Sequence, residues 1–234
     1  MPVGVICNVL ALAAGGLIGA KGKNLISGEL KEKLYLVFGT CAMGIGISSV
    51  ILMKNMPAVI LSVVLGSVIG VLLHLNSRIE KGGAKLAALI PSSPQQTDQN
   101  LLVTAIVLFC VSGTGIYGCI YSGISGDHSI LIAKSVLDLF TAMIFACALG
   151  TATALIAIPQ AVFFLLLFFG AKLLYPLTTS DMICDFRACG GLIMLATGLR
   201  IAKVKDFPIA DMIPAMLLVW PVSWMWSAWI LPLL

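Results

Sequence analysis

The chain has 234 residues, of which 60% are apolar and only 10% are charged. Soluble domains are nearer half apolar and a quarter charged, and the mean hydropathy here is +1.09. This composition excludes an ordinary cytosolic enzyme, a disordered chain and a nucleic-acid-binding protein. The net charge of +4 comes mostly from short charged clusters between long apolar runs, which is typical of polytopic membrane proteins.

Apolar runs long enough to cross a bilayer follow one another along the chain. A hydrocarbon core of about 30 Å needs roughly 20 apolar residues per helix. The sequence therefore predicts an all-α, polytopic helical membrane protein, one transmembrane domain over residues 1–234 with about eight spans. The expected spans are 3–20, 34–53, 57–75, 101–121, 129–150, 154–174, 186–203 and 208–232. Residues 150–153 or Pro159 must supply the turn between the fifth and the sixth.

The lysines and arginines indicate an orientation in the membrane. Most of them lie in the segments 21–33, 76–100 and 200–207. The positive-inside rule places these segments in the cytoplasm, so both termini of an eight-span chain would be periplasmic. The longest segment, 76–100, ends in PSSPQQTDQN, which has the composition of a flexible linker. Its AKLAALI portion is expected at the membrane surface.

An internal repeat is one hypothesis for this arrangement. A shift of 151 residues lays spans one to three on spans six to eight, with Gly19-Ala20-Lys21 on Gly170-Ala171-Lys172. The two triplets would have opposite orientations around two central helices, as in many secondary transporters. A generic hydropathy match explains the same register equally well. Both the 3+3 inverted repeat and the chance match therefore stay open.

The fifth expected span carries the most unusual residues. Asp138 falls near the midplane of the bilayer, and Lys134 lies one helical turn earlier on the same face. Ionised side chains inside a membrane are costly and usually face a partner or water, so they are functional candidates. The alternative is a static ion pair that locks helices or protomers together.

Other polar residues are further candidates for a binding or coupling site. Asn8 lies in the first span and Gln160 in the sixth, where amide side chains either bridge helices or line a polar path. Asp127 and His128 directly precede the fifth helix and could begin an outer vestibule. The alternative is that Asp127 or Ser129 caps this helix.

Several kinds of chemistry are not indicated. The seven cysteines include no CxxC pair, so neither a disulfide framework nor a metal cluster is expected. The sequence shows no nucleophile–base pair, phosphate-binding loop or zinc motif. We therefore expect no enzyme activity, no metal and no cofactor.

Four motifs together resemble a known family. They are NxxAxxxGGxxG at 8–19, FCVSG at 109–113, GDHSxLxxKSxLD at 126–138 and CGGLIMLATGL at 189–199. The chain resembles the YqgA-like family of bacterial multi-pass inner-membrane proteins over its whole length. This resemblance implies an inner-membrane location and a loose link to biofilm formation. It supplies no catalytic or binding residues.

Two functional hypotheses follow. The first is a small secondary transporter or permeation protein for an ion or small polar solute, because of the buried Lys134–Asp138 pair and the inverted-repeat hypothesis. The second is a non-transporting regulatory or scaffold protein in the membrane, because few acidic residues lie at depth. The expected partners are the lipid bilayer and such a solute, with a homo-oligomer left open and no nucleic acid.

Overall fold

The computed structural model describes residues 1–22, 28–90, 99–174, 176 and 178–233, and the described residues form helices joined by turns. Helices satisfy their backbone hydrogen bonds internally, as a lipid environment requires. The elements are α1 (Val3–Lys21), α2 (Gly28–Val50), α3 (Met56–Leu72), α4 (Leu75–Leu89), α5 (Gln99–Cys110), α6 (Gly113–Ser125), α7 (Ser129–Leu149), α8 (Ala152–Leu155), α9 (Ala157–Leu174), α10 (Ser180–Ile201), α11 (Ile209–Met212), α12 (Ala215–Met225), the π-helical turn η2 (Trp226–Ile230) and the 3₁₀ turn η3 (Leu231–Leu233).

The predicted class of a polytopic helical membrane protein is confirmed. Within the described ranges, seven helical segments are long and apolar enough to cross a membrane, and the bent pair α3–α4 raises the number to eight if it forms one span. Each of the eight expected segments coincides with helix in the structure. The expected connection 76–100 is helical over its first part, in α4, and most of its polar tract lies outside the described residues.

The exposure of side chains also fits a lipid environment. On α1 the buried positions include Asn8, Gly15 and Gly19, whereas Leu10 and Leu17 are exposed. Most residues of α1 that face the other helices are therefore small or polar, with Val5 and Leu12 also buried among them, and large apolar residues cover the outside. This is the reverse of a helix on the surface of a soluble protein.

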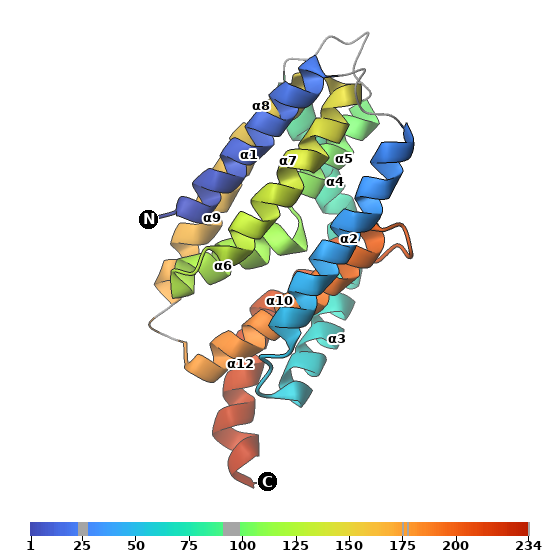
Figure 1. The fold of residues 1–234 in the computed structure, drawn as a ribbon. Coiled ribbons are helices and arrows are strands. Elements are labelled where there is room, and N and C mark those ends of the chain that lie inside the picture. Colours follow the sequence, from blue (N-terminus) through green and yellow to red (C-terminus); the bar gives the residue numbers. More distant parts are fainter. Residues whose placement is uncertain (23–27, 91–98, 175, 177, 234) are drawn as a thin grey trace. The chain divides into compact units, whose positions relative to one another are not determined.

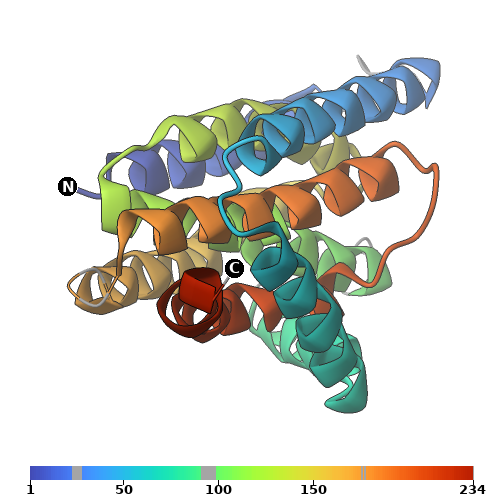
Figure 2. The same ribbon diagram turned by 90° about the horizontal axis from the view of Figure 1, so that it is seen from below.

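The described residues form two compact units. The first comprises 1–35 and 78–173, and the second comprises 36–77 and 174–234. In the first unit α1 lies alongside α7, and α5, α6 and α8 also pack against α7 (Figure 1). In the second unit α3 packs against α10 and α12 (Figure 2). The single transmembrane domain and the inverted repeat expected from the sequence stay predictions.

Two turns determine how the helices of the first unit follow one another. Gly150 ends α7 with a φ of 61°, a left-handed conformation that favours glycine. This places the turn between the fifth and sixth spans at the first of the two expected positions, and Pro159 lies inside the first turn of α9. The second turn, between α5 and α6, was not expected: the span 101–121 is broken at Val111–Ser112.

Candidate functional site

The buried ion pair on α7 is the centre of the site. The ammonium group of Lys134 contacts the carboxylate of Asp138, and the two side chains are only 5% and 10% exposed. Their spacing of four residues places them on one face of the helix. The structure thus puts both residues on one face of α7, as the sequence predicted, in direct contact and buried.

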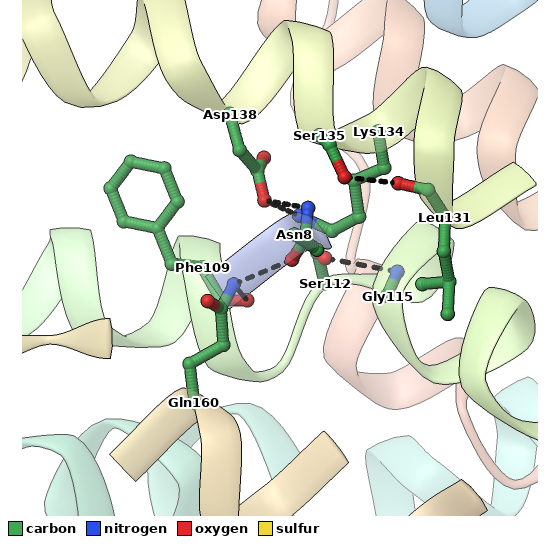
Figure 3. Close-up of polar contacts among 9 residues, drawn as sticks. All are labelled: Asn8, Phe109, Ser112, Gly115, Leu131, Lys134, Ser135, Asp138 and Gln160. Carbon is green, nitrogen blue, oxygen red and sulfur yellow. Dashed lines mark hydrogen bonds and ion pairs between the residues drawn. The ribbon is translucent and has the colours of Figure 1, made fainter. Parts of the chain in front are cut away.

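Two amide side chains connect this pair to other helices. Asn8 on α1 donates a hydrogen bond from Nδ2 to the Oδ2 atom of Asp138, at 2.9 Å. Gln160 on α9 donates from Nε2 to the Oδ1 atom of Asn8, at 3.0 Å. Asn8 therefore lies between Asp138 and Gln160, as Figure 3 shows. Both amide side chains are fully buried. Through these contacts the four polar residues form one chain of hydrogen bonds across three helices.

The broken span brings backbone groups to the same place. Gln160 Nε2 also donates to the carbonyl oxygen of Phe109, at 3.1 Å, in the last turn of α5. Ser112 has an extended backbone, with φ −69° and ψ 141°, and its hydroxyl oxygen accepts a hydrogen bond from the amide of Gly115 (Figure 3). The carbonyl end of one half-helix and the amide end of the next therefore meet beside the ion pair.

Local sequence explains why the helix breaks there. Serine is a favoured N-cap because its side chain can satisfy a free amide of the first turn. Gly115 is required by space, because a Cβ atom there would lie 2.6 Å from the Phe164 ring and 3.1 Å from Cε of Lys134. The segment Ser112–Gly115 thus favours a new helix start within an otherwise continuous apolar run.

Close helix packing brings Asn8 to Asp138. A Cβ atom at Gly15 would lie 2.2 Å from the carbonyl oxygen of Leu139, and one at Gly19 would lie 2.3 Å from that of Met143. Only glycine allows α1 and α7 to approach so closely along this line. A short amide side chain can then reach the carboxylate across the interface.

Asp127 and His128 do not belong to this cluster. Oδ1 of Asp127 accepts a hydrogen bond from the amide of Ser129, at 2.9 Å, and His128 Nδ1 hydrogen-bonds the hydroxyl of Ser122. His128 precedes Lys134 by six residues, about 9 Å along a helix axis. The N-cap of α7 is His128, with no side-chain cap hydrogen bond, so the expectation that Asp127 or Ser129 occupies that position was wrong; Asp127 instead accepts from the first helical amide one residue further out. Among the described residues, no three His, Cys, Asp or Glu side chains come together as a metal site.

A second buried carboxylate was missed by the sequence analysis. Asp185 on α10 is fully buried, and it accepts hydrogen bonds from the backbone amides of Lys54 and Asn55, at 2.9 and 2.8 Å. Its other oxygen accepts from Asn55 Nδ2 and from the hydroxyl of Ser223, at 2.9 and 2.6 Å. The expected span began at residue 186, whereas α10 begins at Ser180 and takes Asp185 into the helix packing.

The two carboxylates have related but different surroundings. Each accepts from an asparagine 130 positions earlier in the chain, Asn8 for Asp138 and Asn55 for Asp185. Asp185 accepts hydrogen bonds from four neutral donors, two on each oxygen. Such an arrangement suits a carboxylate that holds helices together. Asp138 instead has a cation as its partner.

Comparisons with known proteins agree with the resemblance seen in the motifs. Residues 3–224 match the family described as "Protein of unknown function (DUF554)". The chain is 43% identical over 233 residues to "Uncharacterized protein YqgA" of Escherichia coli (strain K12), covering 98% of this chain and 99% of that protein. It is 25% identical over 221 residues to "Uncharacterized membrane protein YdfK" of Bacillus subtilis (strain 168), covering 92% and 93%. No solved structure matches. Because the match extends over nearly the whole sequence, the chain belongs to the DUF554 family, and it is a membrane protein.

Proposed function

We propose that this protein is a small secondary transporter or permeation protein for an ion or small polar solute. The observation that carries the proposal is the break between α5 and α6, beside the buried Lys134–Asp138 pair. Non-helical backbone at membrane depth is tolerated where it is buried in protein or lines a cavity. Transporters commonly build their midplane sites from such half-helix ends.

The groups around the break suit a small charged or polar solute. The site offers a carboxylate, an ammonium group and two amide side chains, from Asp138, Lys134, Asn8 and Gln160. The end of α5 adds a carbonyl oxygen, that of Phe109. Intramembrane ionisable residues in a polar network are typical of ion and proton pathways.

A non-transporting scaffold or regulatory protein, with the link to biofilm formation that the resemblance implies, is the second candidate. Asp185 favours it, because the same chain already uses one buried carboxylate as a static anchor between α3, α10 and α12. If Lys134–Asp138 were such an anchor, the pair would only hold the helices together, and the protein would transport no solute.

Flux measurements separate the two candidates. The purified protein is reconstituted in liposomes and tested with alkali cations, amino acids and organic acids. Asp138→Asn should abolish flux of the transported solute. The matched control is Glu29→Gln, which removes an ion pair of the same spacing, Lys33–Glu29, whose side chains are 70% and 77% exposed. Absence of flux for the whole panel would support the scaffold.

The proposal includes an orientation in the bacterial inner membrane. Both termini are periplasmic, and the segments 21–33, 76–100 and 200–207 are cytoplasmic. Phosphatase and fluorescent reporters fused after residue 234 and within 92–98 test this. A cytoplasmic C-terminus would mean that the chain has one span fewer than expected. The two triplets of spans would then lose the opposite orientation that the inverted repeat needs.

A further inference from the structure

We propose that a groove between α4, α5 and α9 binds an anionic phospholipid, with an acyl chain in the groove and the phosphate at Arg78, Lys81 and Lys85 of α4. Lipid binding at this place is independent of the transport function proposed above. It would be a site that selects one class of lipid by its charge, in addition to the general contact that every spanning helix makes with the bilayer.

The groove lies within the first compact unit and has a mostly apolar lining. Its volume is about 400 Å³, and ligand sites usually have about 300–1,000 Å³. The apolar lining includes Ile79 and Leu86 from α4, Ile106 and Val107 from α5, and Pro159 and Phe163 from α9. Within the described part of the chain, Lys85 is the one charged residue that lines it. Such a surface suits a hydrocarbon chain, which is as apolar as these side chains.

Two neighbouring glycines of α4 show where the helix is packed and where it is open. Gly83 is buried, and a Cβ atom there would lie 3.1 Å from the side chain of Val107 and 3.3 Å from that of Val103. Gly82 also lines the groove, but a Cβ atom there would meet nothing within 4 Å. α4 therefore touches α5 on one side and leaves space beside this contact.

The basic residues of α4 share one face of the helix. At 3.6 residues per turn, Arg78, Lys81 and Lys85 fall within an arc of about 60°, and Glu80 falls on the far side. All three basic side chains are exposed. Among the described residues, none of the three forms an ion pair with a carboxylate. Because Lys85 also lines the groove, this basic face runs along the edge of the groove.

Charge complementarity selects the headgroup. With 15 residues, α4 is about 22 Å long, so it does not by itself cross a hydrocarbon core of about 30 Å. The long side chains of lysine and arginine can extend their charged ends toward the lipid headgroups. Basic pockets between membrane helices are typical binding sites for anionic headgroups. A zwitterionic lipid has the same chains but brings a cation of its own to the basic face, so it should bind more weakly.

The charged part and the apolar part of the site require a ligand that has both. Lys85 belongs to the basic face and also lines the groove, so a phosphate and the chain attached to it would contact α4 together. A free phosphate ion would meet only exposed basic side chains, whose interactions water and salt weaken. A neutral hydrocarbon would gain nothing from these charges. The ligand is therefore an anionic amphiphile of the membrane.

Lipid titrations of the purified full-length protein in detergent, followed by native mass spectrometry, test the headgroup. Dioleoyl phosphatidylglycerol should bind more tightly than dioleoyl phosphatidylcholine. Changing Arg78, Lys81 and Lys85 together to Gln should weaken phosphatidylglycerol binding roughly a hundredfold, because each basic residue near the headgroup contributes about fivefold. The matched control changes the exposed Lys21, Lys33 and Lys205, which lie away from the groove, to Gln and should retain binding. Equal affinity for the two lipids, or an equal loss in both triple variants, would overturn the proposal.

The groove is tested by a variant that fills it and keeps every charge. Gly82→Leu should weaken phosphatidylglycerol binding and reduce the rise in Tm that this lipid causes, without lowering the Tm in detergent alone. Gly44→Leu on α2 is the control, because a Cβ atom there also meets nothing within 4 Å. Glycerol 3-phosphate, which has the phosphate but no chains, should leave the Tm unchanged. Wild-type lipid binding by Gly82→Leu, or an equal rise in Tm with glycerol 3-phosphate, would refute the site. A dimer that Gly82→Leu dissociates would assign the groove to a second copy of the chain and refute it as well.

Discussion

Breaking the buried ion pair on one side should strongly destabilise the protein. Asp138→Asn keeps an oxygen that can accept from Asn8, but it leaves the Lys134 ammonium group without a counter-ion. Removing one partner of a buried pair costs about 3–5 kcal/mol. The ring of Phe164, 5.9 Å from Nζ, faces the ammonium group in the wild type as well, so this contact does not reduce the cost of the substitution. We therefore expect the free energy of unfolding to fall by about 3–5 kcal/mol.

Replacing both charges should restore only part of the stability. Lys134→Met with Asp138→Leu removes the stranded cation, and apolar replacement of a buried pair is often neutral or stabilising. In this structure, however, Asn8 Nδ2 would lose its acceptor. An unsatisfied buried donor costs about 1–3 kcal/mol. The double variant should thus be more stable than Asp138→Asn and slightly less stable than the wild type.

Reversible unfolding in mixed detergent micelles, followed by circular dichroism, measures these differences. Glu29→Gln is the control, because the exposed pair Lys33–Glu29 should contribute no more than about 0.5 kcal/mol. If the free energy of unfolding of Asp138→Asn lies within about 0.5 kcal/mol of the wild-type value, Lys134 does not depend on Asp138 as a buried counter-ion. If the double variant is stable and transports at the wild-type rate, Asp138 has no role in transport.

Three further variants, and one matched control, test the packing around the clusters. Gly15→Val should lower the free energy of unfolding by about 1–3 kcal/mol or more, because its Cβ would lie 2.2 Å from the Leu139 carbonyl oxygen. Gly44→Ala is the control and should not destabilise the protein, because a Cβ there meets nothing within 4 Å. Ser112→Ala should cost about 1 kcal/mol by removing the cap of α6. Asp185→Asn should cost at least about 2 kcal/mol, because its amide group would face other donors. All are measured by the same unfolding assay, and a wild-type midpoint for Gly15→Val or Asp185→Asn would contradict the packing described.

Part of the candidate site could be predicted from the sequence because it depends on local rules. Lys134 and Asp138 are four residues apart within an apolar run, so helical periodicity alone places them on one face of the same helix. Asn8 and Gln160 were recognised as polar residues inside spans. The hydrogen bonds from Asn8 to Asp138 and from Gln160 to Asn8 could not be predicted, because each joins residues 130 or more positions apart along the chain.

The composition and the apolar runs by themselves determined that this is a helical membrane protein, because lipid requires each spanning segment to satisfy its own backbone hydrogen bonds. They did not determine the break at Ser112, since an isolated Ser–Gly segment in a hydrophobic run is compatible with a continuous helix. Nor did they reveal that Asp185 is buried, because hydropathy assigns the charged segment before residue 186 to water. The tertiary structure decided both. Phe164 and Lys134 crowd Gly115 where α6 begins, and four donors, on Lys54 and Asn55 just before α3 and on Ser223 of α12, compensate Asp185 for the loss of water.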